Sequence, residues 1–335
     1  MQKHLLPALL VLLFHAGMAQ QRRVQHICPY TLEMHKDGGR QVISYAANFR
    51  PNKTDTSIRT LLVYIHGLHR NALSYFDYAM DAVRSAGQKK TTLIIAPQYV
   101  NEEDPGFGSD FLYWHKAGWK DGYASVPNDR KRQQASMSSY EVLDSLVTAV
   151  LGSGNFPNIA KVIIAGHSAG GQFVQRYSAI TPLPDLFTAL KFRFIVMNPS
   201  SYLYPDNKRP DGNGDFVVPD SNGCMEYNRY PKGLTGLNAY AQITGPDRIV
   251  RQMLQRDIVI LVGGEDTRID DPDLDVSCQA NLQGQFRLQR ALYFIAHIAS
   301  FPEYGVKKNY NIVKGYSHEG DMIGSNEAIK WIFGW

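Results

Sequence analysis

The chain has 335 residues, of which 44% are hydrophobic and 20% are charged, with 35 Lys and Arg against 31 Asp and Glu. This apolar share is typical of a globular protein and excludes a disordered chain, which would carry fewer aliphatic side chains and more net charge. The formal net charge is only +4, and no basic run is longer than three residues. The composition therefore argues against a nucleic-acid partner.

Residues 1–19 have the pattern of a secretory signal peptide. Lys3 supplies the positive charge, an apolar run covers residues 5–14, and small residues lead up to Ala19. The apolar run is about ten residues long, whereas a membrane-spanning helix needs roughly 20. We therefore expect cleavage after Ala19, a mature chain without a membrane anchor, and a secreted or periplasmic location.

Export permits disulfide bonds, and the chain has three cysteines: Cys28, Cys224 and Cys278. One bond and one free thiol are the most that this number allows within one chain. Cys224 and Cys278 both lie in the C-terminal half, and we expect them to pair. Spacing alone leaves the other pairings open.

Residues 20–335 alternate between short β-rich runs and helical patterns, which predicts a single domain. Strands are expected at 41–47, 60–65, 92–96, 162–165, 194–197, 258–262 and 311–313. Helices are expected from a capping box at Ser138 and Glu141, over about 279–298, and over 327–333. The continuous apolar runs are typical of strands covered on both faces. They predict a mostly parallel central sheet with helices on both sides.

Two long polar segments interrupt this alternation, at about 101–137 and 200–233. Loops of this length in a compact domain are often lids or binding loops. Their aromatic residues, which include Trp114, Trp119 and Tyr202, offer surfaces on which a sugar or phenolic ring would stack. The alternative interpretation is that these rings pack the two insertions onto the core.

The most informative motif is Gly-His-Ser-Ala-Gly-Gly at 166–171, between a predicted strand and a predicted helix. Gly-x-Ser-x-Gly in this context is a nucleophile elbow, in which a strained turn presents the serine hydroxyl. Small residues are needed two positions before and two after Ser168, and Gly166 and Gly170 meet that need. The following helix start places backbone N–H groups beside the reacting oxygen. We therefore expect Ser168 to be a nucleophile.

A serine nucleophile needs a base and an acid that orients the base, and in this motif they follow the serine as acid and then histidine. Asp266 comes directly after the predicted strand 258–262 and is our choice of acid, with Glu265 as the close rival. Four further aspartates (Asp270, Asp271, Asp273 and Asp275) are weaker candidates, and we expect them to form a solvated loop. His318 follows the last predicted strand and is the expected base, because His297 lies within a helical apolar pattern.

The oxyanion hole needs two backbone N–H donors. One is expected at Ala169, directly after the nucleophile. The other is expected after the strand 60–65, where Gly67 lets the backbone turn; Leu68 is preferred there, and His69 is possible. His66 is expected to be a structural hydrogen-bonding residue. Arg70 is expected to brace this loop, and the alternative is that it contacts an anionic substrate.

The sequence has no established metal-binding pattern. Neither His-Glu-x-x-His nor paired Cys-x-x-Cys occurs. The segment 211–215 begins like a calcium loop, but Phe216 stands where the required glycine belongs and Asn222 where the final glutamate belongs. We expect no metal and no organic cofactor.

With these residues in place, the chain resembles the α/β-hydrolases. More narrowly it resembles secreted esterases related to polyhydroxybutyrate depolymerases and to feruloyl and acetylxylan esterases. The segments that carry the resemblance are IHGLHRNALSYF (65–76), IIAPQY (94–99), VIIAGHSAGGQFVQRYSA (162–179), VMNPSSYLY (196–204), LVGGEDT (261–267) and VKGYSHEG (313–320). The resemblance implies an α/β-hydrolase fold and a serine hydrolase of carboxylic esters, small or polymer-linked, with Ser168, Asp266 and His318 as its triad.

Two other functions are compatible with these residues. A serine peptidase or amidase would pass through the same oxyanion intermediate. A secreted binding protein would keep the fold without turnover, but such a protein would more naturally have lost one of the three triad candidates. Catalysis on esters is therefore the preferred interpretation.

Overall fold

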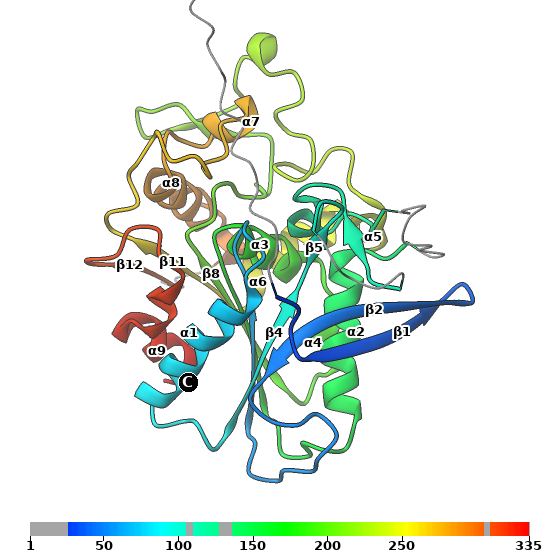
Figure 1. Cartoon of the computed structure of the whole chain (residues 1–335). Coiled ribbons are helices and arrows are strands. Elements are labelled where there is room, and N and C mark those ends of the chain that lie inside the picture. The colour runs from blue at the N-terminus through cyan, green and yellow to red at the C-terminus, as the bar shows by residue number, and fades with distance from the viewer. Residues whose placement is uncertain (1–25, 105–109, 127–135, 305–308, 335) are drawn as a thin grey trace, which may run out of the picture.

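The computed structural model describes residues 26–104, 110–126, 136–304 and 309–334. An eight-stranded sheet forms its centre (Figure 1). Its spatial order is β1-β2-β4-β3-β7-β8-β11-β12. The strands are Tyr30–Lys36 (β1), Gly39–Ala47 (β2), Thr60–Ile65 (β3), Thr92–Gln98 (β4), Lys161–His167 (β7), Lys191–Met197 (β8), Ile258–Gly263 (β11) and Tyr310–Val313 (β12). Pairing is antiparallel for β1 with β2 and for β2 with β4, and parallel for every other neighbouring pair. The predicted mostly parallel sheet is confirmed.

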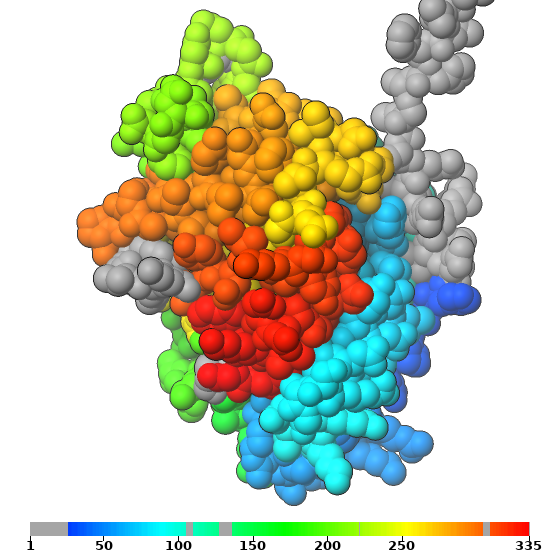
Figure 2. Space-filling model, turned by 90° about the vertical axis from the view of Figure 1, so that its left-hand side faces the viewer, coloured from blue at the N-terminus to red at the C-terminus, as the bar shows by residue number. Residues whose placement is uncertain are grey.

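Helices cover both faces of this sheet (Figure 1). One face packs against Ala72–Ser85 (α1) and Asn326–Phe333 (α9), and Figure 2 shows α9 in red beside α1 in cyan. The other face packs against Ser139–Gly152 (α2), Ala169–Ile180 (α3), Pro246–Gln255 (α6) and Arg287–Ala299 (α8). Three shorter helices are Leu183–Leu186 (α4), Ala239–Thr244 (α5) and Cys278–Asn281 (α7).

The continuous apolar run of β3 shows why the sheet is covered on both sides. All six of its residues are buried. Leu61 and Val63 belong to the core cluster on the α2 and α3 side, whereas Leu62 and Tyr64 belong to the cluster on the α1 and α9 side. Because successive side chains of a strand point to opposite faces, each face has its own apolar layer.

The helix predicted from the capping box is present as α2, but the box itself is only half formed. The Ser138 side chain accepts a hydrogen bond from the Tyr140 N–H, as an N-cap residue does. The Glu141 carboxylate does not complete the box but instead forms an ion pair with Lys36 on β1.

The single helix predicted over about 279–298 is wrong. The structure has two helices there, α7 and α8, separated by residues 282–286. Gly284 has φ +136°, which interrupts helical geometry, and the Gln283 side chain bonds both to the backbone N–H and to the C=O of Tyr202. A second difference is β1, which was not predicted and which pairs with β2 through a turn at Asp37 and Gly38.

The described residues of the two predicted insertions form short elements. The first holds Val100–Asn101 (β5), Tyr113–Trp114 (β6) and the 3₁₀ helix Gly118–Asp121 (η1). The second holds Arg209–Pro210 (β9), Phe216–Val217 (β10) and the 3₁₀ helix Ser221–Gly223. They meet where the Tyr230 hydroxyl donates to the backbone carbonyl of Asp121 (2.6 Å). The described parts of the two insertions are therefore in direct contact.

The structure contains the expected disulfide between Cys224 and Cys278, and Cys28 is free and buried. The predicted signal peptide, residues 1–19, lies outside the described residues. Within the described part of the chain, no helix is long and apolar enough to cross a bilayer.

Candidate active site

Ser168 lies in the turn between β7 and α3, in a backbone conformation that non-glycine residues seldom adopt (φ 57°, ψ −118°). Its N–H donates to the Met197 carbonyl at the end of the neighbouring strand. Close backbone contacts fix the turn: a Cβ at Gly166 would lie 2.1 Å from the Gly170 oxygen, and one at Gly170 would lie 2.3 Å from the Ile65 oxygen. Only glycine fits at both positions, so the motif is required by packing as well as by backbone conformation.

His318 joins Ser168 to Asp266. Its Nε2 lies 3.0 Å from Ser168 Oγ, and its Nδ1 lies 2.7 Å from Asp266 Oδ2. In the tautomer with the proton on Nδ1, His318 donates to Asp266 and accepts from the serine hydroxyl. The structure thus brings together the three residues predicted as a triad. Glu265, the rival acid, is exposed. Its backbone N–H and C=O, rather than its carboxylate, bond to the loop after β12.

Asn198 holds the two loops that carry the acid and the base. Its Oδ1 accepts from the Gly263 N–H at the end of β11 (2.8 Å), and its Nδ2 donates to the Ser317 carbonyl (2.7 Å). Ser317 precedes His318, and its hydroxyl donates to the Glu265 carbonyl. One buried amide side chain therefore sets the distance between the end of β11 and the loop after β12.

Arg287 lies behind Asp266 and was not predicted. Its fully buried guanidinium contacts Asp266 Oδ1 (3.4 Å), Asp271 Oδ1 (3.2 Å) and Ser200 Oγ (2.9 Å). A carboxylate that is 1% exposed is stable only when it is paired, and here the cation and the histidine bind its two oxygens. No sequence motif marks Arg287; its role depends on where α8 begins relative to β11.

The expected oxyanion donors, Leu68 and Ala169, both lie beside Ser168 at the wall of the same cavity. The loop that carries Leu68 is braced by the buried Arg70, whose guanidinium pairs with Asp104 (2.7 and 2.9 Å) and also donates to the Leu68 carbonyl (3.0 Å). This carbonyl is turned toward Arg70. His69, the alternative donor residue, pairs its side chain with Asp273.

Two buried histidines near the nucleophile are held neutral. His66 Nδ1–H donates to the Gly67 carbonyl and Nε2 accepts from the Tyr99 N–H, and burial lowers the pKa of His66 to about 3. His167 accepts from or donates to the Tyr75 hydroxyl through Nδ1 (3.0 Å). Burial, followed by the nearby His318, holds the pKa of His167 well below its usual range. Neither ring is placed as the base of Ser168.

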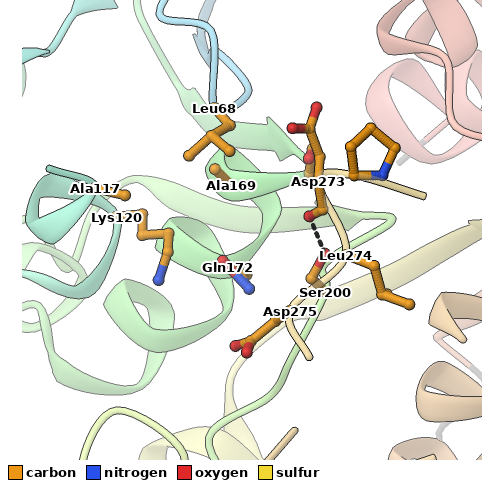
Figure 3. Close-up of a pocket in the computed structure, with 11 residues that line it drawn as sticks. Leu68, Ala117, Lys120, Ala169, Gln172, Ser200, Asp273, Leu274 and Asp275 are labelled. Atoms are coloured by element: carbon orange, nitrogen blue, oxygen red, sulfur yellow. Dashed lines mark hydrogen bonds between the residues drawn. The ribbon is translucent and has the colours of Figure 1, made fainter. Parts of the chain in front are cut away.

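Ser168 lies between two cavities. The first, the Lys120 cavity, has a volume of about 310 Å³ and includes Leu68, Lys120, Ser168, Ala169, Gln172 and Asp275 in its wall. The second, the His318 cavity, has a volume of about 400 Å³ and includes Tyr75, His167, Ser168, Arg268, His318 and Glu319. In the Lys120 cavity, Leu68 and Ala169 lie at one end and the Lys120 amine and Asp275 carboxylate at the other (Figure 3). A substrate with groups on both sides of its reacting carbon therefore has a separate space for each.

The expectation of a solvated acidic loop at 270–275 is wrong except for Asp270, which is exposed. Asp271 bonds to Arg287, Asp273 pairs with His69, and Asp275 pairs with Lys232 (2.9 Å). Lys232 and the Ser277 hydroxyl hold the pKa of Asp275 well below its usual range, although burial acts in the opposite direction. The loop is folded inward because its carboxylates have cationic partners there.

The aromatic residues expected to stack on a substrate lie in the core. Trp114, Trp119 and Tyr202 are each 0% exposed and line neither cavity. Trp119 stacks on Tyr99, and Tyr202 stacks on Phe294. Their positions agree with the packing interpretation, because these large rings fill the space between the insertions and the sheet.

Among the described residues, no group of three or more His, Cys, Asp or Glu side chains is arranged to hold a metal ion. Sequence reasoning missed Lys120 and Gln172 as cavity residues. Gln172 follows the nucleophile by one helical turn, so its position on the wall of the site was open to prediction from spacing. Lys120 lies in the first insertion, and its place depends on the fold of that insertion.

Comparison with known proteins identifies the fold. No family model matches the chain, and no curated protein matches its sequence. A poly(3-hydroxybutyrate) depolymerase from Bordetella parapertussis matches over 92% of both chains, with a TM-score of 0.61 and 21% identity. A poly(aspartic acid) hydrolase from Sphingomonas sp. KT-1 matches over 92% of this chain and 100% of its own, with a TM-score of 0.59 and 22% identity. The chain has the α/β-hydrolase fold.

Proposed function

We propose that this protein is a serine hydrolase of carboxylic esters, with Ser168 as nucleophile, His318 as base and Asp266 as the acid that orients it. The observation that carries the proposal is His318 bonded at once to Ser168 Oγ and to Asp266, with Ser168 on a strained elbow. A strained serine costs stability and persists when the surrounding structure enforces it, which is common at active sites. The preference for esters over amides rests on the resemblance of the sequence motifs.

The reaction is an acyl transfer in two halves. Ser168 Oγ attacks the ester carbonyl as His318 Nε2 takes its proton, and the backbone N–H groups of Leu68 and Ala169 stabilise the oxyanion. The imidazolium then gives that proton to the leaving alcohol oxygen, and the C–O bond breaks to leave an acyl-serine. Water attacks the acyl-serine by the reverse sequence, which releases the acid and restores the hydroxyl. Asp266 stays ionised and stabilises the imidazolium.

The test is hydrolysis of p-nitrophenyl butyrate by the wild type and by Ser168→Ala. We expect the variant to lose roughly 10⁴-fold or more in kcat, as removal of a triad serine does elsewhere. Ser85→Ala, which changes an exposed serine at the end of α1, is the matched control and should retain full activity. Equal activity in Ser168→Ala and wild type would overturn the proposal. Hydrolysis of aminoacyl p-nitroanilides without hydrolysis of esters would assign an amidase instead.

A fluorophosphonate probe gives a second readout that does not depend on the substrate chosen. It should label one residue, identified by peptide mass as Ser168, and labelling should fail in His318→Gln. Inertness of the folded wild type toward both the esters and the probe would favour a binding protein over an enzyme.

We further propose that the protein is exported after cleavage of residues 1–19. The signal-like sequence and the Cys224–Cys278 disulfide support this, since such bonds persist in oxidising compartments. N-terminal sequencing of protein recovered outside the cytoplasm should begin at Gln20. Recovery of only full-length, reduced protein from the cytoplasm would contradict export.

A further inference from the structure

The two cavities beside Ser168 can be assigned to the two halves of an ester. A leaving alcohol must lie next to the His318 Nε2 that protonates it, and His318 lines only the His318 cavity. Ala169, the donor residue next to the nucleophile, lines only the Lys120 cavity. The alcohol therefore belongs in the His318 cavity, and the acyl chain belongs in the Lys120 cavity.

In the described part of the chain, positive charge exceeds negative charge at the far end of the Lys120 cavity, where Arg176 is buried and Lys120 and Lys232 are partly buried. Lys120 lines the cavity and pairs with Asp121 (2.6 Å), and Lys232 pairs with Asp275 (2.9 Å). Arg176 lies behind Gln172, where both side chains donate to the Ser201 hydroxyl (3.1 Å each).

A fourth cation, Arg290, closes the same end. It donates to the backbone carbonyls of Ser200 and Asp275 (2.5 and 2.8 Å), both of which are cavity residues. Among the described residues, this end of the cavity thus has four cations and two carboxylates, and Asp121 is shared between Lys120 and Arg176. Asp273 also lines the cavity, but its carboxylate points away from Lys120 and pairs with His69 (Figure 3).

Arg176, whose Nε lies 3.6 Å from Asp121 Oδ1, gives an independent sign that hydrogen-bond acceptors are too few around these cations. Its side chain is fully buried, and its Nη1 has no hydrogen-bond partner among the described residues. A buried guanidinium nitrogen without a partner costs free energy, and so does a buried excess of one charge. An anion at the far end of the cavity would offset the excess of positive charge there.

We propose that the acyl part of the substrate ends in a carboxylate, which binds at Lys120 in the far end of the Lys120 cavity. This inference rests on the proposed ester hydrolysis and names the class of acid that is released: a dicarboxylic acid, formed from its half-ester. The Lys120 ammonium meets the carboxylate, Gln172 and Asp275 flank it, and Arg176, Lys232 and Arg290 supply the surrounding positive potential. The ester carbonyl then lies at Ser168, Leu68 and Ala169.

The experiment compares ethyl half-esters of succinic, glutaric and adipic acid with ethyl butyrate, pentanoate and hexanoate. Each pair has the same number of acyl carbons and differs only by the terminal carboxylate, and ethyl 6-aminohexanoate is the cationic counterpart. Acid release is followed by titration at constant pH. For at least one pair we expect kcat/KM of the half-ester to be higher by on the order of tenfold or more, the size expected for a charge-assisted hydrogen bond.

Lys120→Met should remove this preference, measured as the ratio of kcat/KM for the half-ester to kcat/KM for the neutral ester, whereas Lys120→Arg should keep the preference in part. Turnover of the neutral ester shows that the Lys120→Met protein is folded. Lys89→Met is the matched control, since Lys89 is exposed and lies just before the amino end of β4, whereas Ser168 follows the carboxyl end of β7. If Lys120→Met does not fold, competitive inhibition of the wild type by the free dicarboxylates, and not by the monocarboxylates, tests the same site.

The outcomes separate the two proposals. Turnover of the neutral esters with equal or lower kcat/KM for every half-ester would overturn the carboxylate site and keep the esterase. A preference for ethyl 6-aminohexanoate would assign the site to Asp275 and a cation, and would overturn it too. Failure to hydrolyse any ester, including p-nitrophenyl butyrate, would overturn the proposed function and the site that rests on it.

Discussion

The proposed nucleophile and the proposed acid–base pair are held in place by different means. Ser168 lies on a turn whose shape is enforced by close packing, because a Cβ at Gly166 or Gly170 would lie only 2.1 or 2.3 Å from a backbone oxygen. Asp266 and His318 lie on loops, and their positions depend on polar side chains, chiefly Asn198 and Arg287. The packing that fixes Ser168 depends on glycines near it in the chain. The hydrogen bonds that fix Asp266 and His318 come from segments far apart in the chain.

Each half of the site is therefore sensitive to a different kind of substitution. A close-packed turn tolerates no added atom, because the opposing backbone cannot move without moving two strands. A polar network tolerates small changes in volume but not the loss of a charge, because the remaining buried groups are then left without partners. The expected effects of substitution follow from that distinction.

The largest effect is expected from Gly166→Ala. The new Cβ would lie 2.1 Å from the Gly170 oxygen and 2.8 Å from a Val174 methyl carbon, so the elbow must open or the protein must fail to fold. We expect no measurable esterase activity and little soluble protein. Gly152→Ala, where nothing lies within 4 Å of the new atom, is the control and should change stability by less than about 1 kcal/mol. Normal activity in Gly166→Ala would refute steric enforcement of the elbow.

The next largest effect is expected from Arg287→Met, which keeps the volume and removes the charge. Asp266 and Asp271 lose a shared cation, and breaking a buried pair of this kind costs roughly 3–5 kcal/mol in the free energy of unfolding. Misplacement of the acid should lower kcat by about tenfold to a hundredfold.

Two measurements separate a positioning role of Arg287 from a purely structural one. KM for the ester should change less than kcat, and Arg287→Lys should recover part of kcat. A variant that is less stable but has unchanged kcat would show that Arg287 serves the fold and not the acid.

Removal of the disulfide should have a smaller effect. The bond closes a loop with a sequence separation of 54 residues and ties the second insertion to α7, beside the loop that carries Asp271, Asp273 and Asp275. The paired variant Cys224→Ser with Cys278→Ser should lose about 3 kcal/mol, mainly through greater freedom of the unfolded chain. Chemical denaturation measures this loss. Because neither sulfur touches the triad, kcat at 25 °C should stay within about threefold of wild type, and a larger fall would mean that the loop depends on the bond.

The smallest effect is expected on the pH dependence of the free energy of unfolding, through His66. His66 stays neutral in the folded protein because burial lowers its pKa to about 3, whereas in the unfolded chain it takes up a proton below about pH 6.5. Proton binding favours the unfolded state as the pH falls below 6.5. The free energy of unfolding therefore falls by about 1 kcal/mol per pH unit. His66→Gln keeps an acceptor for the Tyr99 N–H and cannot titrate, so its stability should fall less between pH 6.5 and 5. Identical slopes in the two proteins would contradict a neutral buried His66.

The sequence predicted the parts of the molecule that depend on residues close together in the chain. The elbow was predicted because the strand, the glycines and the helix start are adjacent in the chain. The assignments of Asp266 and His318 needed only the order of the strands and the loop after each. The sheet was predicted because apolar runs such as 60–65 are typical of strands buried on both faces.

The parts that were not predicted depend on contacts between distant segments. Arg287 and Lys120 look like ordinary helix and loop residues, and their roles appear only when α8 and η1 are packed beside β11 and α3. The aromatic rings of Trp114 and Trp119 were equally compatible with binding and with packing, because residue type does not say which side of an insertion faces the core. The break at Gly284 depends on the Gln283 contact with Tyr202, a residue far away in the chain.

Cys28 has a consequence for the chemistry of the chain as a whole. A free thiol beside a disulfide in the same chain can attack that bond or join two molecules, but Cys28 is 3% exposed, and burial raises its pKa to about 12. The thiolate is the reactive species, so the folded protein is protected against both thiol exchange and intermolecular crosslinking. Cys28 packs with Ala46 and Ala96, and its N–H donates to Gln98. Its rate of alkylation therefore reports how often this edge of the sheet opens, with the rest of the molecule still folded.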